Sequence, residues 1–192
     1  MAGNTLCDLA DISSAENCGE SMAGIATTLY VAFKGDLKGE PPAYKTTAES
    51  DMGDFAMIED TPGFQFAEGK RFYKWEIDTD SGQLTSTSVK QQKGFTNQLV
   101  FKIQKMTPTI SALLRVLNNR KDAFIAIPTD DGKYTMIYHP TRNIQIDSGG
   151  ISYDSGTTPD SDSGTTVTVS VPALAPVVYY EGEVPTTPAV SG

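Results

Sequence analysis

The sequence predicts a mainly β fold, either a β-sandwich or a partly closed barrel, with one flanking helix at about residues 108–119. Three observations predict this class. Many short segments alternate apolar and polar residues, which is the side-chain period of a strand. Gly, Pro, Ser and Thr are abundant, as expected for short strands joined by turns. Only one stretch carries the spacing of an amphipathic helix. We expect about eight to ten strands and extended arms and loops.

The composition fits one compact β domain with arms, although 192 residues could also make two very small domains. Hydrophobic residues make up 39% of the chain, enough for a core, and charged residues only 20%. We expect an N-terminal arm at 1–26, a β domain at 27–181 and a flexible C-terminal tail at 182–192. Residues 1–10 lack the basic and apolar regions of a secretory signal. No apolar run has the roughly 18 residues that span a membrane. The chain is therefore expected to be made in the cytosol and to stay soluble until it assembles.

The first confident strand is 27–33, which is apolar on both faces and is expected to be buried or covered. A long polar connection at 35–53 follows, and it contains Pro41-Pro42. Connections of this length are uncommon in compact domains, so it is either functional or a surface insertion. Residues 54–66 are expected to form two short strands around a Thr61-Pro62-Gly63 turn.

The clearest strand is 71–78, where an aromatic face that is expected to be buried alternates with a charged, solvated face. Residues 80–82 turn the chain into 83–92, an extended segment with unusually polar faces. A third alternating strand follows at 97–105. These three segments are expected to form one antiparallel meander. The aromatic face carries Tyr73, Trp75 and Ile77, and the charged face carries Lys74, Glu76 and Asp78.

The helix at 108–119 is predicted by its cap and its stripe. The Thr107 hydroxyl can accept a free N–H of the first turn, and Pro108 suits the first helical position because its missing donor costs nothing there. The apolar stripe consists of Ile110, Leu113, Leu114 and Leu117, at i, i+3, i+4 and i+7. We expect this stripe to pack on a sheet as a core element.

Strands resume after the helix. Residues 123–128 and 134–138 are expected to form a hairpin through the turn at 129–132. A further short strand is expected at 143–146, and a loop rich in Ser, Gly, Asp and Thr at 147–164. The Thr/Val alternation of 165–171 predicts a strong strand, and 175–180 is expected to pair as an edge.

The sequence contains no recognisable catalytic motif, and we expect neither an enzyme nor a cofactor. The single histidine, His139, supplies no metal cluster, and a strand-end role is its ordinary explanation. The acidic segment at 147–162 could mimic a calcium loop but lacks the terminal Glu ligand, so it is interpreted as solvated turns. Glu76 and Asp78 share a strand face, but nothing indicates a pocket that would separate their pKa values.

The net charge of −9 disfavours a protein that grips nucleic acid, because such proteins need Lys and Arg to displace counterions. An acidic surface can let DNA slide past, or it can serve solubility alone. The two cysteines, Cys7 and Cys18, are interpreted as free thiols, although their spacing also permits one bridge.

The order of segments resembles the major tail tube proteins of long-tailed bacteriophages, especially those of Bacteroides-type gut bacteria. The resemblance covers about residues 20–182 and is one of order and texture, with no diagnostic catalytic motif. The residues that carry it are Phe72-Tyr73-Lys74-Trp75-Glu76-Ile77-Asp78 with Asp80-Ser81-Gly82, Phe95-Thr96-Asn97-Gln98-Leu99-Val100-Phe101, Ser111-Ala112-Leu113-Leu114-Arg115-Val116-Leu117 with Asn118-Asn119-Arg120, Phe124-Ile125-Ala126-Ile127 with Asp131-Gly132, and Thr166-Val167-Thr168-Val169 with Tyr180-Glu181-Gly182.

The resemblance implies a virion protein whose hexameric rings stack into a hollow tube through which DNA passes without specific binding. It implies partners of three kinds: copies of itself, the tape measure, and the terminator and baseplate proteins. An early long loop and the terminal arms of such proteins contact the next ring, and the inner wall is often acidic. The residues expected at the contact between rings are Asp36, Pro41, Pro42, Tyr44 and Asp51.

The predicted meander is the candidate lining of the channel, because its polar side chains offer DNA no strong grip. The same residues could instead be ordinary solvent-facing positions of a monomer. The expected lining residues are Lys74, Glu76, Asp78, Thr85, Thr87 and Lys90.

Two other functions stay open. One is a different ring-forming virion protein, such as a tail terminator or head–tail connector, which forms one ring and does not polymerise. The other is a carbohydrate- or cell-surface-binding β module, which needs an exposed aromatic platform. Trp75 and Tyr179-Tyr180 are the candidates for that platform, and Trp75 is expected to be buried.

Overall fold

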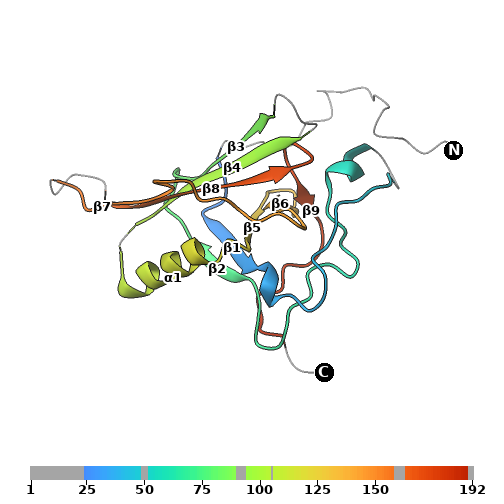
Figure 1. Ribbon diagram of the computed structural model, residues 1–192, viewed down its shortest axis with the longest axis horizontal. Helices are drawn as coiled ribbons and strands as arrows, with labels where there is room; N and C mark the ends of the chain where they lie inside the picture. Colours follow the sequence, from blue (N-terminus) through green and yellow to red (C-terminus); the bar gives the residue numbers. More distant parts are fainter. Residues whose placement is uncertain (1–23, 49–51, 90–93, 105, 158–162, 190–192) are drawn as a thin grey trace.

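The computed structural model describes residues 24–48, 52–89, 94–104, 106–157 and 163–189, and its described part folds into two antiparallel sheets and one α-helix (Figure 1). The mainly β class is confirmed, and the sheets do not close into a barrel. The five-stranded sheet has the order β2-β1-β5-β6-β9 and the four-stranded sheet the order β3-β4-β8-β7. The elements are β1 (Thr28–Phe33), β2 (Tyr73–Glu76), β3 (Gln83–Ser88), β4 (Phe95–Ile103), α1 (Pro108–Asn119), β5 (Ala123–Pro128), β6 (Tyr134–Ile137), β7 (Ile151–Asp154), β8 (Gly164–Ala173) and β9 (Tyr179–Tyr180), with 3-10 turns at Lys34–Asp36 and Met52–Ala56.

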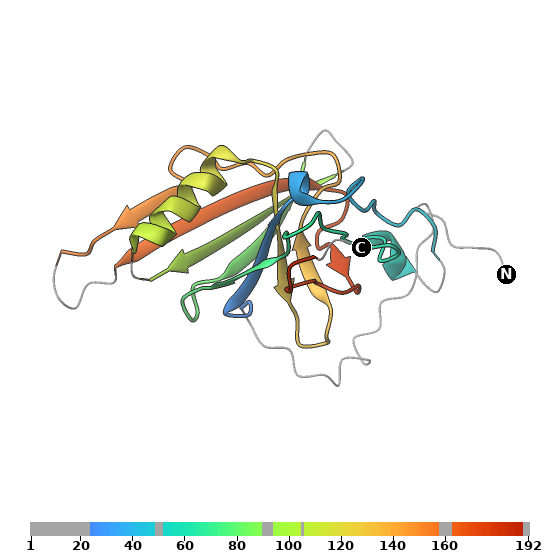
Figure 2. The ribbon, with the colours of Figure 1, turned by 90° about the horizontal axis from the view of Figure 1, so that it is seen from below.

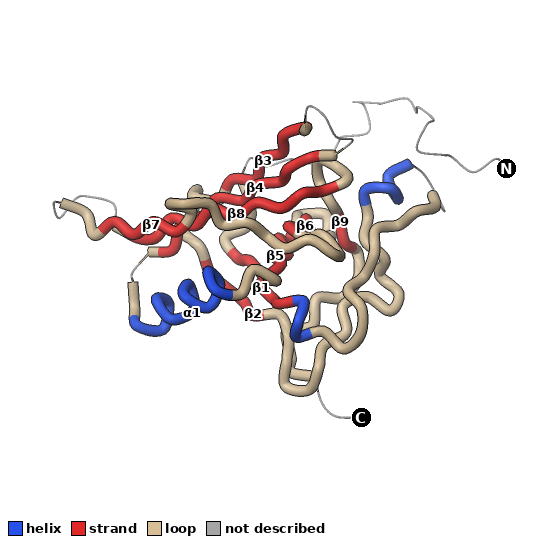
Figure 3. Tube along the Cα trace, in the orientation of Figure 1, coloured by secondary structure: helices blue, strands red, loops and turns tan. Residues whose placement is uncertain are grey.

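The five-stranded sheet is apolar on both faces because it lies between two hydrophobic clusters. In β5, Ile125 and Ile127 belong to the cluster between the two sheets, whereas Phe124 and Ala126 belong to a second cluster on the other side. Loops cover this second face, and Figure 3 shows them gathered beside the five-stranded sheet. The expectation that the first strand is covered on both faces is therefore confirmed.

The four-stranded sheet has one buried face. Leu99, Phe101, Val167 and Val169 are fully buried and pack toward the five-stranded sheet. Because side chains alternate along a strand, their neighbours in sequence point to the opposite face. The Thr/Val alternation of β8 thus places valines inside and threonines outside, as the sequence indicates.

Helix α1 confirms the predicted bounds and cap. The Thr107 hydroxyl accepts the Ile110 N–H at 3.2 Å. Leu114 and Leu117 are buried in the cluster between the sheets, but Leu113 is 44% exposed. The helix lies at the margin of the core, along one end of the four-stranded sheet (Figure 2), and Ile110 also packs against the core, so Leu113 is the exposed member of the predicted stripe.

The predicted meander is wrong. Strand β2 pairs with β1 in the five-stranded sheet, whereas β3 and β4 form a hairpin in the other sheet. The chain crosses between the sheets after Ile77, because Asp78 N–H donates to the Lys102 carbonyl of the β4 strand at 2.8 Å. Tyr73 is 36% exposed rather than buried. Alternation identifies a strand but carries no information about its partner.

Three smaller expectations also differ from the structure. Residues 54–66 form no pair of strands: they contain the turn Met52–Ala56 in part, and Ile58 and Phe66 make isolated bridges to Tyr44 and Leu37. The loop predicted at 147–164 contains β7, which pairs with β8. The strand predicted at 143–146 is reduced to one bridge, Gln145 to Ser170.

The tail beyond residue 181 has fixed partners through residue 189. Phe72 N–H donates to the Pro185 carbonyl at 2.9 Å, and Ala189 exchanges backbone hydrogen bonds with Gly69 and Lys70. Val184 is buried in the second cluster. The flexible tail that the sequence predicts at 182–192 is therefore packed against the chain over its described residues.

Candidate self-association surface

The outer face of the four-stranded sheet is broad and almost uncharged. Across β3 and β4, Thr85 lies opposite Gln98 and Thr87 opposite Thr96. We call this surface the hydroxyl face. Lys102, from the end of β4, and Asp154, from β7, are the charged residues of the described strands on this side. The hydroxyl face consists of Thr85, Thr87, Thr96, Gln98, Thr166 and Thr168.

Strand β3 is the open edge of this sheet. It pairs with β4 alone, and five of its six residues are exposed. It carries no charged residue and no proline. Natural proteins usually protect edge strands with charges, prolines or bulges, because an open edge is a template for pairing with another chain. Strand β3 lacks the first two of these protections.

The directions of the backbone N–H groups in β3 follow from the hydrogen bond made just after the strand ends. The N–H of Val89 donates to the Gly94 carbonyl at 3.0 Å. Successive N–H groups of a strand point to opposite sides, so those of Ser88, Ser86 and Leu84 point away from β4. These three groups are placed to pair with a further strand.

The opposite edge of the same sheet is β7, which pairs with β8 alone. Together with the start of β8, it projects beyond the body of the molecule (Figures 1 and 2). Within the described ranges, the four-stranded sheet therefore ends on both sides in a strand that pairs on one side only.

The five-stranded sheet has more protected edges. At β9, Ile58 N–H donates to the Tyr179 carbonyl at 2.9 Å, so a loop covers that edge. At the other edge, Lys74 and Glu76 of β2 form an ion pair at 2.9 Å. Charges of this kind discourage strand pairing. The contrast makes the four-stranded sheet the candidate for self-association.

The predicted lining residues do not share one face. Thr85 and Thr87 lie on the hydroxyl face, whereas Lys74 and Glu76 belong to β2 in the other sheet. Asp78 lies in the crossing between the sheets, and Lys90 lies outside the described residues. Sequence reasoning missed the outer threonines of β8, whose signal is the Thr-x-Thr spacing of that strand.

Two of the predicted ring-contact residues are turned inward. Tyr44 is 8% exposed, and its hydroxyl donates to the Tyr138 carbonyl at 2.7 Å. Burial raises the pKa of Tyr44, which keeps its hydroxyl protonated. The Tyr138 hydroxyl in turn donates to the Pro42 carbonyl at 2.6 Å. The 35–53 loop is thus held on the body; Pro41 and Pro42 are half-buried, and Asp51 lies outside the described residues.

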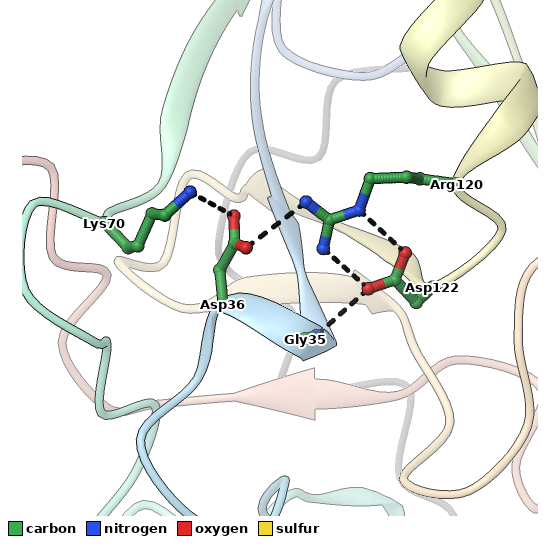
Figure 4. Close-up of polar contacts among 5 residues, drawn as sticks. All are labelled: Gly35, Asp36, Lys70, Arg120 and Asp122. Carbon is green, nitrogen blue, oxygen red and sulfur yellow. Dashed lines mark hydrogen bonds and ion pairs between the residues drawn. The ribbon is translucent and has the colours of Figure 1, made fainter.

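Asp36, the second inward-facing residue, belongs to an ionic cluster at the base of the same loop (Figure 4). Arg120 contacts Asp36 at 3.2 Å and binds Asp122 through two nitrogens, at 2.9 and 3.2 Å. The Asp36 carboxylate also lies 3.6 Å from Lys70, and Asp122 accepts the Gly35 N–H at 3.0 Å. Bidentate contacts between a guanidinium and a carboxylate are strong and fix the relative orientation of the two side chains. We call these five residues the Arg120 cluster.

Protonation states in the Arg120 cluster favour the ion pairs. The hydrogen bond to Asp122 raises the pKa of Arg120. Burial alone would raise the pKa of Asp122, but hydrogen bonds from Arg120 and the Gly35 N–H outweigh burial and hold that pKa below its usual value. The cluster therefore joins the end of α1 to the start of the loop while both partners are charged.

Replacing Arg120 by glutamine is expected to lower the free energy of unfolding by about 1–3 kcal/mol, because Asp36, only 9% exposed, loses its closest cation. Since the pKa of Asp122 is lowered in the folded state, its stabilising effect is present near neutral pH and is lost as the pH falls through the folded pKa. Urea denaturation should show the difference from wild type shrinking in acid. The neighbouring exposed Lys121→Gln is the control, and an equal loss in both variants would contradict this account.

The described residues contain no group of side chains that could hold a metal ion. No three His, Cys, Asp or Glu side chains in this part of the chain are grouped to hold a metal. The His139 ring Nδ1 accepts the N–H groups of Thr141 and Arg142 at 3.2 and 3.0 Å, so it shapes the turn after β6. Burial lowers the pKa of His139, with further lowering by Arg142 and Lys34. Among the described helices, none is long and apolar enough to cross a membrane.

The aromatic residues named for a carbohydrate platform do not form one. Trp75 is half-buried, and its ring lies 6.5 Å from that of Phe101 in the core. Tyr180 is 1% exposed and belongs to the second cluster. The expectation that Trp75 is buried is met only in part, because the side chain is half-buried. No protein-family model, curated protein or solved structure matches this chain.

Proposed function

We propose that this protein is a structural subunit that assembles with copies of itself into the stacked rings of a bacteriophage tail tube. One observation carries the proposal: the four-stranded sheet combines an uncharged hydroxyl face with an uncovered, uncharged edge strand, β3. The edge supplies a means of joining copies. The face supplies a wall that the joined copies would share.

The edges indicate how the ring would form. Pairing β3 of one subunit with β7 of the next is a head-to-tail contact, and such contacts generate closed rings when the rotation between copies closes. Six copies of a four-stranded sheet would contribute 24 strands. Barrel diameter grows with strand number, and barrels of 16–18 strands already enclose a water-filled channel. A ring of this size would be wide enough for a polymer to pass.

The hydroxyl face suits a conduit. Threonine hydroxyls and a glutamine amide form weak hydrogen bonds that water can replace, and they present no array of cations to phosphates. DNA would therefore pass without being held. The acidic surplus of the chain is not concentrated here, since Asp154 is the acid of the described strands on this side. We propose a polar, nearly neutral wall in place of the acidic wall expected from the sequence.

This function places the protein in the virion after synthesis in the bacterial cytoplasm. Its partners would be its own copies, together with tape measure, terminator and baseplate proteins. A single ring, as in a tail terminator, is the second candidate. The inward orientation of Asp36 and Tyr44 favours it, because two residues expected to contact the next ring are occupied within their own subunit.

Negative-stain electron microscopy of the concentrated protein tests the proposal. Tubes of uniform width support the tail tube. Isolated rings would replace it with the single-ring function. Particles that remain monomeric across concentration and salt would contradict both.

A further inference from the structure

A groove of about 570 Å³ lies between helix α1 and strand β7, away from the hydroxyl face. One wall is a flank of the helix, formed by Ser111, Arg115 and Asn118, at i, i+4 and i+7. The other wall carries Ile151 and Tyr153 of β7. The lining also includes apolar side chains and a short polar turn: Met106, Leu114, Ile146, Asp147, Ser148, Gly149 and Thr165.

The groove also contains an unsatisfied polar group. Thr165, at the start of β8, is 1% exposed, and its side-chain oxygen has no hydrogen-bond partner among the described residues. Buried hydroxyls normally have a partner, because an unpaired one loses the hydrogen bonds that it would make with water. Thr165 lines the groove, so an occupant with a backbone N–H or carbonyl could supply the missing bond. The unpaired Thr165 hydroxyl is an observation independent of the shape of the groove.

A helix beside an edge strand is a common arrangement for binding an extended peptide. The peptide adds to the strand edge through its backbone, and its alternate side chains enter the adjacent pocket. Here β7 has a free edge and Tyr153 is 56% exposed. A volume of several hundred Å³ holds the side chains of only a few residues, while the rest of an extended segment runs along the strand. The arrangement therefore fits a short extended segment with apolar side chains and a carboxylate for Arg115.

The chain itself starts near this groove. Ile25 lies against Gly82, and the adjacent Ser81 hydroxyl accepts the Lys102 N–H at 3.2 Å. Ile103, the next residue, pairs with Thr165 across the strands. The first described residues are thus at the same end of the four-stranded sheet as the groove. Twelve residues of extended chain reach about 40 Å, so residue 12 can arrive there.

The sequence before residue 24 has the matching chemistry. Residues 5–12 read Thr-Leu-Cys-Asp-Leu-Ala-Asp-Ile, in which three large apolar side chains are interspersed with two carboxylates. The first 33 residues contain no Lys or Arg, so nothing in them would repel Arg115. We propose that the groove between α1 and β7 binds residues 5–12 of this chain, from the same copy or from a neighbour. The proposal does not depend on tube formation, and a neighbour's β3 that pairs with the β7 edge would displace the segment from that edge.

Cysteine cross-linking in the full-length chain tests this site, because Cys7 lies within the proposed segment. The starting variant is Cys18→Ser, which leaves Cys7 as the only native thiol. Ser111→Cys then places a second thiol on the groove wall, and Thr109→Cys places one on the same helical turn outside the groove lining. Both positions are exposed. A disulfide needs Cα atoms within about 7 Å, so it reports residence in the groove.

We expect the thiol at position 111 to form a disulfide with Cys7 at least about tenfold faster than the thiol at 109, because docking raises the local concentration of Cys7. Peptide mapping identifies the bond. A monomeric product places the segment in its own groove, and a dimeric product places it in a neighbour's groove; both support the site. Equal rates at the two positions would overturn it.

Two further variants separate binding from mere proximity. Arg115→Glu should slow the cross-link of position 111 several-fold, because it places a carboxylate against Asp8 and Asp11. Thr165→Val should also slow it, whereas Thr165→Ser, which keeps the hydroxyl, should not. Circular dichroism confirms that each variant is folded. If neither Arg115→Glu nor Thr165→Val changes the rate, the groove does not bind the segment.

Discussion

Ser88→Pro is expected to abolish self-association while leaving the subunit folded. The Ser88 N–H points away from β4, so proline removes no hydrogen bond between β3 and β4. It does remove a donor that a neighbouring strand would need, and its ring obstructs the approach of that strand. Sedimentation velocity and electron microscopy of the concentrated variant should show monomers where the wild type forms rings or tubes.

Ser88→Ala is the matched control for this prediction. It alters the same exposed side chain but keeps the backbone N–H, so assembly should match the wild type. Loss of assembly in both variants would show that the Ser88 side chain, and not its backbone N–H, makes the contact between copies. Assembly by both variants would remove β3 as the joining edge.

Phe64→Ala is expected to lower the free energy of unfolding by about 3–5 kcal/mol, the range typical of large-to-small changes in aromatic cores. Phe64 is 2% exposed, and its ring stacks on Phe124 at 4.9 Å. It also meets the rings of Phe72, Tyr138 and Tyr180 edge-on, at 5.7, 5.3 and 4.9 Å. The residue therefore joins the loop layer to the five-stranded sheet, and its truncation leaves a cavity that four rings cannot easily fill.

Urea denaturation followed by tryptophan fluorescence measures this loss, since Trp75 is the single tryptophan. Tyr153→Ala is the comparison, because Tyr153 is 56% exposed and its truncation should change stability by less than about 0.5 kcal/mol. A Phe64→Ala cost as small as that of Tyr153→Ala would show that the loop layer contributes little to stability.

Local patterns allowed much of the fold to be predicted from the sequence. The cap residue Thr107, Pro108 and the apolar spacing fixed helix α1 at its observed bounds. The alternation at 97–105 and 165–171 correctly predicted two strands, which are β4 and β8. These features depend on residues close in the sequence, where the period of side chains determines the element.

What the sequence did not reveal depends on contacts between distant residues. Nothing in 71–78 indicates that β2 pairs with β1. The predicted lining residues therefore combined strands that belong to two different sheets. Asp36 and Tyr44 appear in a polar loop, and their burial follows from partners 84 and 94 positions away. The hydroxyl face emerges only when β3, β4 and β8 are placed side by side. The groove at Thr165 likewise joins elements that the sequence separates.

The central claim is that copies join through the outer edge of β3, and amide hydrogen exchange tests it most directly. Exchange should be compared between dilute protein and protein concentrated until it assembles. The account predicts that the amides of Leu84, Ser86 and Ser88 slow at least about tenfold on assembly, because each becomes hydrogen-bonded to a neighbour. Assembly that leaves these three amides unchanged, with protection appearing elsewhere, would contradict it.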